Sequence, residues 1–458
     1  MLIRQTICAS LLLFVLGVGQ SLAALNSEPA LPALLTARDA VRFALSHNPD
    51  TTIGQQRLIA AQAAIDLERA TMVPQVSLSS QYSQTNAPMY SFGNILNQGE
   101  FSNSINFNDP GRTDSLKTGV QLGYRLFNGG RDQAMVEAAQ GEASASQMEL
   151  AAIHARLAFE VMRAFYGIKQ ATEIIDVNQS TVKALSSSLK MAQARHEEGV
   201  LLMDAVLDLE VQLSRARENL IQAQHAKALA RKIFLALLGV EEGVFEIVPE
   251  SGDIQEVPLS AVANPRFELK VLDEKIEAAL ARVRQAQAGS FPVVDGFAGY
   301  SLDQGFVTDG SDHSWQAGVV LKYALFDGDK TSSELIRAMA TVAELRGKRR
   351  KLELAIGLEV QQARNTLRES EERLQVTEKT IAQARKSAEI NRARFAEGMV
   401  LPSDLIAVEK RLSDALIRRT MAKTSRLIAI AELRRASGLP QFDDLPEIST
   451  AKEPEQQQ

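Results

Sequence analysis

The stretch that decides the fold runs from Gly130 to Glu197 and reads GRDQAMVEAAQGEASASQMELAAIHARLAFEVMRAFYGIKQATEIIDVNQSTVKALSSSLKMAQARHE. It is a helical pattern of nearly seventy residues without a proline. A mostly apolar seam follows it, and after the first step the spacing alternates between three and four, as in a coiled coil. The seam consists of Ile153, Leu157, Val161, Ala164, Ile168, Ala171, Ile175, Asn178, Val182, Leu185, Leu189 and Ala192. At about 1.5 Å per residue this helix is about 100 Å long, so we expect an elongated molecule.

The same pattern recurs 199 residues later, from Asp329 to Glu397. Adding that offset to each seam position gives Leu352, Ile356, Val360, Ala363, Leu367, Ser370, Leu374, Thr377, Ile381, Ala384, Ala388 and Asn391. The punctuation also repeats, because Gly199 corresponds to Gly398 and Phe127 to Phe326. A repeat of this length and fidelity indicates an internal duplication.

The N-terminus resembles a secretory signal peptide. Arg4 precedes the apolar run Ile7–Val18, and small residues end at Ala23, where we expect cleavage. Cys8 is the one cysteine of the sequence and lies inside this leader, so the mature chain is expected to contain neither a disulfide nor a thiol for lipid attachment.

We therefore expect five segments in the chain. They are a signal peptide (1–23), a first repeat (24–240), an acidic linker (241–258), a second repeat (259–442) and a disordered tail (443–458). Without the leader the chain has 49 basic and 56 acidic residues, a formal charge of −7, which argues against a nucleic-acid partner.

Outside the leader, no apolar run approaches the roughly twenty residues that a membrane-spanning helix needs. Four shorter segments instead alternate with a period of two, with apolar residues on one face and polar or small residues on the other. They are Pro74–Tyr82, Lys117–Leu126, Pro292–Ser301 and Trp315–Leu325. About ten alternating residues suit a tilted strand crossing a bilayer, although alternation alone also fits a soluble sheet that packs on one face. The third segment is the weakest, because Asp295 and Phe297 fall on the same face.

Other signals place the remaining elements. Thr36 is expected to cap a short helix that is interrupted at Asn48-Pro49. Irregular loops are predicted for Ser83–Ser115 and Leu302–His313, where Asn, Ser and Gly are common. Each long helix should end at a glycine and be followed by a return helix, over Asp204–Leu238 and Ser403–Ser437.

Four strands cannot close a transmembrane barrel, for which about eight is the minimum. Open sheet edges in lipid would leave backbone groups without hydrogen bonds. Several chains should therefore contribute strands to one barrel, and the helices that follow the strands should continue as a tube. This architecture predicts a conduit.

These features together resemble the TolC-like family of outer membrane efflux and secretion channels. The resemblance covers Leu35 to Gln441 and rests on a doubled order of helix, Asn-Pro, helix, strand, loop, strand and Leu-Phe-(Asn/Asp)-Gly. The turns that pair Gly199 with Asp204 and Gly398 with Asp404 belong to the same pattern.

The resemblance implies a mostly α fold with a small β part. It implies a homotrimer in which four strands per chain form a twelve-stranded β-barrel in outer membrane lipid, joined to a long coiled-coil α-helical barrel in the periplasm. The implied partners are a periplasmic adaptor (membrane fusion) protein and an inner-membrane pump of the RND or ABC type, in efflux or in type I secretion. It implies no cofactor and no enzymatic chemistry, and the missing N-terminal cysteine suggests the non-lipidated branch.

The resemblance also implies a periplasmic gate and docking tips. Asp404 matches the first aspartate of the family's gate ring, whereas the second is replaced by Ala407. Phe395 stands where the family has a tyrosine and Val400 where it has an arginine, so a gate held by packing is expected. Asp404 could instead simply cap a helix. The expected adaptor-docking tips are the two turns, Gly199 with Val200 and Gly398 with Met399.

Three other functions fit the sequence less well. An enzyme or metal site is disfavoured because the five histidines are scattered, with no carboxylate or thiol at ligand spacing; they are His47, His154, His196, His225 and His313. A secreted periplasmic coiled-coil adaptor or scaffold is the main alternative, but paired amphipathic strands with Trp315 and Tyr323 favour the channel. A diffusion porin should consist almost entirely of strands, unlike this chain.

Overall fold

The computed structural model describes residues 31–248 and 265–443. The predicted signal peptide therefore lies outside the described residues, as do 249–258 of the predicted linker and 444–458 of the predicted tail. The chain divides into two compact units, each built from both repeats. The described parts of the helical unit are 31–52, 153–248 and 358–443, and those of the sheet unit are 53–152 and 265–357.

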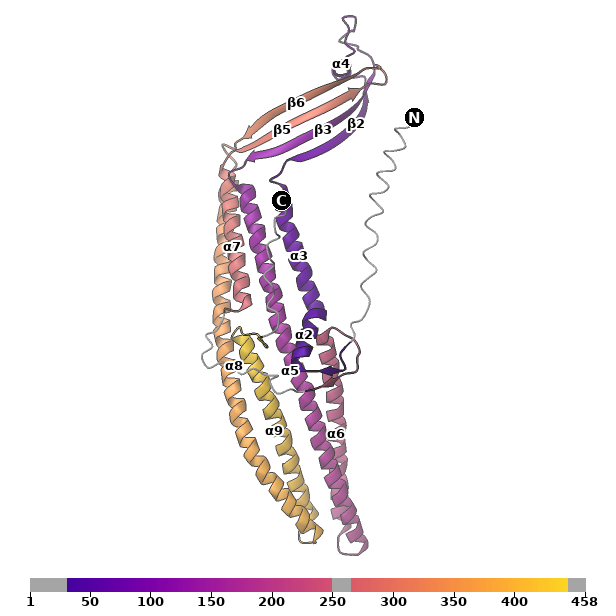
Figure 1. Cartoon of the computed structure of the whole chain (residues 1–458), viewed down its shortest axis with the longest axis vertical. Helices are drawn as coiled ribbons and strands as arrows, with labels where there is room; N and C mark the ends of the chain where they lie inside the picture. Colours follow the sequence, from indigo (N-terminus) through magenta and orange to yellow (C-terminus); the bar gives the residue numbers. More distant parts are fainter. Residues whose placement is uncertain (1–30, 249–264, 444–458) are drawn as a thin grey trace. The chain divides into compact units, whose positions relative to one another are not determined.

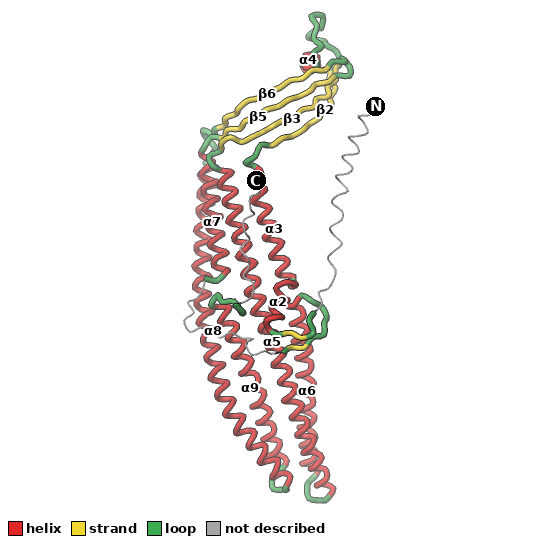
Figure 2. Tube along the Cα trace, in the orientation of Figure 1, coloured by secondary structure: helices red, strands yellow, loops and turns green. Residues whose placement is uncertain are grey.

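Helices dominate the chain (Figures 1 and 2). The α-helices are α2 (Ala37–His47), α3 (Pro49–Ala70), α4 (Pro88–Asn97), α5 (Arg131–Glu197), α6 (Met203–Leu238), α7 (Phe267–Gln287), α8 (Lys330–Ala396) and α9 (Pro402–Ala436), with a 3-10 turn at Ala288–Ser290. The strands are β1 (Leu34–Leu35), β2 (Gln75–Thr85), β3 (Thr113–Phe127), β4 (Glu246–Ile247), β5 (Val293–Gln304) and β6 (Ser311–Lys322).

The long helices confirm the duplication. α5 and α8 each contain 67 residues, and both their first and last residues are separated by the predicted offset of 199. Even the backbone before them repeats, because Gly130 (φ 82°) corresponds to Asp329 (φ 62°), a left-handed conformation that residues other than glycine rarely adopt. All twelve seam positions are buried or half-buried in both copies. The seam is therefore the side on which each helix packs.

The predicted helix start and break are also confirmed. Thr36 is the N-cap of α2, and its hydroxyl accepts a hydrogen bond from the Asp39 amide at 3.1 Å. α2 ends before Asn48, whose side-chain oxygen accepts from the Asp50 amide at 2.8 Å, and α3 begins at Pro49. Proline needs no hydrogen-bond acceptor at the first helical position, so the break requires no other partner.

In the sheet unit, the four long strands form one antiparallel sheet in the order β2-β3-β5-β6, seen as a single curved layer in Figure 1. β2 and β6 are its edges. The register places Val120 opposite Tyr300 and Tyr300 opposite Trp315, so the predicted apolar positions share one face. Asp295 and Phe297 occur together on the other face, as their spacing predicted.

The prediction of an irregular loop over Ser83–Ser115 is wrong in part. The segment contains α4, which begins with Pro88 at its first position and packs on β3 and β6. Ser91 and Ile95 of α4 are buried, so packing against the end of the sheet stabilises a helix that composition did not indicate. The strands also extend further into both predicted loops than expected.

The last strand ends earlier than predicted, at Lys322 instead of Leu325. Lys322 pairs with Val293, the first residue of β5, which directly follows Pro292. Because proline has no amide hydrogen to donate, the ladder has no partner for the residues after Lys322.

The helical unit is centred on a core where α2, α5 and α6 meet. Phe165, Phe234, Phe245 and Phe442 are all buried there, and Leu35 of β1 joins them while β1 pairs with β4 in parallel. Phe245 belongs to the predicted acidic linker, so the described part of that segment packs on the core. None of the helices in the described part of the chain has an apolar run suited to crossing a membrane.

Candidate functional site

The candidate site in the helical unit comprises the two turns at which the long helices reverse. Gly199 and Gly398 have φ values of 71° and 81°, the left-handed conformation that ends a helix. The backbone bonds match, since the Gly199 amide donates to His196 at 2.9 Å and the Gly398 amide donates to Phe395 at 3.1 Å. Beyond these glycines, the side chains of Val200 and Met399 are each 72% exposed. Both predicted tips thus present an apolar side chain to solvent.

Phe395 lies in an apolar group that we call the tip cluster, and its ring is 2% exposed. The tip cluster joins both helical hairpins and consists of Leu185, Ala192, Val206, Leu209, Leu213, Ala216, Phe395 and Leu405. Phe395 and Leu405 come from the α8–α9 hairpin, and the other residues come from α5 and α6. The phenyl ring therefore packs between the hairpins.

Arg195 adds a polar link between the same hairpins. Its guanidinium, on α5, donates hydrogen bonds to the carbonyl oxygens of Phe395 and Ala396, at 2.6 and 2.5 Å. These are the last two residues of α8, where carbonyls lack partners within the helix and the helix dipole favours a positive charge. The guanidinium carbon also lies 5.4 Å from the centre of the Phe395 ring. Arg195 therefore caps α8 from the neighbouring hairpin.

An ion pair holds α8 against α9 close to the second turn. Arg392 donates to both carboxylate oxygens of Glu409, at 2.5 and 2.7 Å, and the Glu409 side chain is only 4% exposed. The hydrogen bonds to this carboxylate raise the pKa of Arg392, despite the opposing effect of burial. In the first hairpin the corresponding pair is Gln193 and Glu210, at 3.5 Å.

Asp404 and Val400 lie on the other side of the second turn. Asp404 is exposed and is the third residue of α9, whereas Leu401 occupies the cap position without a side-chain hydrogen bond. The alternative that Asp404 caps the helix is therefore wrong, although its charge still complements the helix N-terminus. Val400 is half-buried.

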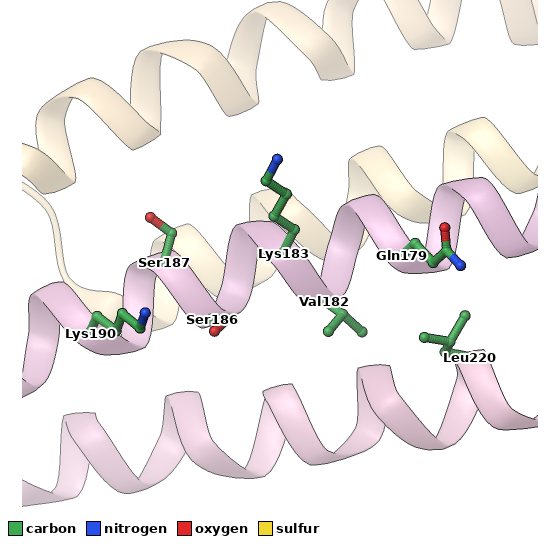
Figure 3. Close-up of a pocket in the computed structure, with 7 residues that line it drawn as sticks. All are labelled: Gln179, Val182, Lys183, Ser186, Ser187, Lys190 and Leu220. Carbon is green, nitrogen blue, oxygen red and sulfur yellow. The ribbon is translucent and has the colours of Figure 1, made fainter.

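A shallow groove of about 410 Å³ runs between α5 and α6 in the same unit (Figure 3). Lys183 and Lys190 lie along it, and Val182 of α5 faces Leu220 of α6. Its remaining lining is polar, from Gln179, Ser186 and Ser187. The groove thus combines two positive charges with a small apolar floor.

The sheet unit has a second surface of functional interest, the apolar face of the four long strands. Its residues are exposed in the single chain, including Leu78 (74%), Trp315 (76%) and Val319 (64%). The opposite face carries small and polar residues such as Ser79, Gln121 and Ser314. Because an exposed apolar face of this extent is unfavourable in water, it requires a partner surface or lipid.

Residues 31–248 and 265–443 contain no cluster of histidine, cysteine, aspartate or glutamate suited to a metal ion. Partial burial lowers the pKa of His154, because desolvation disfavours the charged imidazolium.

Sequence reasoning missed Arg195 and the Arg392–Glu409 pair. The sequence contained a signal for Arg195, because the second repeat also has an arginine at the matching position, Arg394. Glu409 is the counterpart of Glu210 at the repeat offset, but the sequence gives no indication that it pairs with the arginine 17 positions earlier, because only the turn brings α8 and α9 together.

The family model described as "Outer membrane efflux protein" matches residues 40–240 and 259–439. The chain is 28% identical over 346 residues to Protein CyaE of Bordetella pertussis, which covers 73% of this chain and 69% of that protein. It is 22% identical over 413 residues to Outer membrane protein TolC of Vibrio cholerae, covering 85% and 87% of the two chains.

Solved structures share the fold. A membrane protein from Pseudomonas aeruginosa matches with a TM-score of 0.76 at 19% identity, over 88% of this chain and 93% of that one. The predicted mostly α architecture with a four-stranded sheet in each chain is confirmed.

Proposed function

The chain belongs to the outer membrane efflux protein family, and from that premise we propose that it works as a homotrimer that carries cargo from a periplasmic pump assembly across the outer membrane. It is an outer membrane channel for efflux or secretion and not an enzyme, and its family works with partner proteins. The finer proposals concern the trimer, the periplasmic extension, the adaptor and the gate.

The observation that carries the trimer is the sheet. One face is apolar and exposed, the other is polar, and both β2 and β6 are edges with open backbone hydrogen-bonding groups. In lipid such edges must be paired. Joining β6 of one copy to β2 of the next pairs every edge, and three copies give a twelve-stranded barrel with the apolar face toward lipid.

Mass measurement in mild detergent tests the trimer. We expect a protein mass of three chains, and a stable, folded monomer would contradict the proposal. A cysteine pair that joins β2 to β6 should form covalent oligomers, whereas a pair that joins β3 to β5 should crosslink only within one chain, because those strands are neighbours in the same sheet.

For the partner, we propose a periplasmic adaptor that docks on the two turns and is coupled to an inner-membrane pump. Val200 and Met399 provide exposed apolar contacts at the turns, and the Lys183–Lys190 groove provides positive charge for acidic side chains. The expected adaptor surface therefore combines apolar and acidic residues.

Site-directed crosslinking tests the docking. Cysteines at Val200 or Met399 should crosslink to the adaptor, whereas cysteines in the α4 loop, such as at Ser102, should not. Lys183→Glu with Lys190→Glu should reduce the crosslinked product and leave the trimer intact. Crosslinks from the α4 loop alone would show that the orientation is inverted.

For the gate, we propose that Phe395 and Val400 hold the closed state by packing and that three copies of Asp404 form an acidic ring. Asp404 is exposed, as a ring residue must be. Like charges a few ångströms apart in a constriction interact by more than about 1 kcal/mol, so the ring should attract cations.

Planar-bilayer recordings test the ring. The channel should be cation-selective and should be blocked by a multivalent cation added on the periplasmic side. Asp404→Ala should relieve the block, whereas Asp204→Ala, at the matching turn of the first hairpin, should retain it. A block that persists in Asp404→Ala would place the gate in the packing of Phe395 and Val400 alone.

A further inference from the structure

Arg195 caps the end of α8, and the repeat places a second arginine at the matching position of α8. Within the described chain this second arginine has no helix end to cap. Arg394 corresponds to Arg195 by the repeat offset, and it is exposed. No partner for its guanidinium occurs among the described residues. The residues that correspond to the acceptors Phe395 and Ala396 are His196 and Glu197, at the end of α5.

The acceptor end of α5 is built like that of α8. In the first turn the Gly199 amide donates to the His196 carbonyl, and in the second turn the Gly398 amide donates to the Phe395 carbonyl. The following amides also match, since Val200 donates to Arg195 and Met399 to Arg394, each at 2.9 Å. A carbonyl oxygen has two lone pairs and can accept two hydrogen bonds. The Phe395 carbonyl accepts from the glycine amide and from Arg195, so the His196 carbonyl, which accepts from its glycine amide, can also accept from an arginine.

A second contact between the hairpins repeats in the same way. The hydroxyls of Thr181 on α5 and Ser413 on α9 are hydrogen-bonded at 3.2 Å. At the offset of 199 residues, Thr181 corresponds to Thr380 on α8 and Ser413 corresponds to Ser214 on α6, so the second pair also consists of two hydroxyl side chains. Thr181 and Ser413 are half-buried by their contact, whereas Thr380 and Ser214 are both exposed.

Apolar packing gives a third correspondence. Ile406 packs against the tip cluster, at the contact between the hairpins. Its counterpart in the first hairpin is Leu207, whose side chain is 47% exposed. One side of the α5–α6 hairpin is therefore complementary to the α8–α9 hairpin but has no such hairpin against it within the described chain.

We propose that a second copy of this chain fills that position, with its Arg394 donating to the His196 and Glu197 carbonyls of the first copy, and its Thr380 bonded to Ser214. The contact inside each chain is then repeated between chains, so the hairpins alternate around a ring that closes after three copies. Every long helix at the ring would receive an arginine cap from the hairpin before it. This inference rests on the proposed homotrimer and specifies its contact at the turns.

Cysteine pairs in a Cys8→Ser background test the contact. Thr380→Cys with Ser214→Cys in one chain should give, on oxidation of membranes, covalent species of two and three chains and none larger. The control pair, Thr181→Cys with Ser413→Cys, should oxidise within the chain and migrate as a monomer. If the control pair oxidises but the first pair keeps free thiols in protein whose detergent mass is three chains, the inference is wrong and the trimer stands. A detergent mass of one chain would instead overturn the proposed function.

Replacing the arginine tests the cap itself. Added to the Thr380→Cys and Ser214→Cys pair, Arg394→Ala should remove most of the crosslinked product, because the helix ends are no longer held together. Arg385→Ala is the control, since Arg385 is nine residues away and lies on the opposite side of α8 at about 100° per residue. Equal yields from the two alanine variants would show that Arg394 makes no such contact.

Discussion

α5 and α8 are copies of one helix, with the same length and the same seam, yet they are buried to different extents. α8 buries a single stripe, and most of its other side chains are exposed, including Leu354 (60%) and Leu358 (61%). α5 is packed on several sides, and Phe159, the counterpart of Leu358, is 8% exposed. The difference arises because Leu35 of β1, Phe245 and Phe442 pack on the core that α5 shares.

The comparison shows that duplicated sequence does not imply duplicated environment. Some positions that α8 leaves exposed, such as Leu358, have a buried counterpart on α5, here Phe159. In a helical tube, such positions on α8 are available to a neighbouring copy.

The largest expected effect comes from the pair Phe159 and Leu358. Phe159→Ala should lower the free energy of unfolding by about 3 to 5 kcal/mol, because it leaves a cavity in the core. Leu358→Ala should change the stability of the single chain by only about 0.5 kcal/mol, since its side chain is already in solvent. Denaturant unfolding of the protein in mild detergent measures both values. Equal losses would mean that α8 is packed as closely as α5 is.

A smaller effect is expected where the hairpins differ in charge. Arg392→Ala should cost about 2 kcal/mol, because it leaves the buried Glu409 carboxylate without its partner; the exposure of Arg392 keeps the loss below that of a fully buried pair. Gln193→Ala, at the matching position, should cost less than about 0.5 kcal/mol, because Glu210 is exposed. Thermal unfolding in detergent distinguishes the two. The comparison fails if the glutamine variant is the more destabilised.

The smallest effect concerns the residues that precede the long helices. The Asp327 carboxylate accepts from the hydroxyl and the amide of Thr331, at 2.6 and 2.9 Å, and these hydrogen bonds lower its pKa from the ordinary 3.8. A lowered pKa stabilises the folded state above 3.8, and that contribution is lost as the pH falls through the lower folded value. Its counterpart Asn128 accepts from the Arg131 amide at 3.1 Å and does not titrate.

Melting temperatures measured from neutral pH to below 3.8 test this difference. Asp327→Asn should flatten the acid part of the curve, whereas Asn128→Ala should lower the curve by the same amount at every pH. An acid limb that is unchanged in Asp327→Asn would assign the pH dependence to other carboxylates.

Much of the candidate site followed from the sequence. The offset, the glycine turns and the strand alternation predicted both hairpins and the tips at Val200 and Met399, because such patterns depend on local conformation. Phe395 is buried in the tip cluster, and its part in a gate held by packing stays a prediction. The roles of Arg195 and Arg392 could not be predicted, because a charged residue on a helix shows no preference for one partner until the helices are placed side by side.

Helix length, strand alternation and turn position were determined by the sequence alone, since each reflects hydrophobic periodicity or a backbone conformation within a few residues. α4, the β1–β4 pair and the unequal burial of α5 and α8 were decided only by tertiary structure. α4 is stabilised by contact with the end of the sheet, and the core includes Phe245 from the predicted linker and Phe442 from the end of the second repeat. Such contacts join residues far apart in the chain, and their free energy depends on which surfaces meet, which no local pattern encodes.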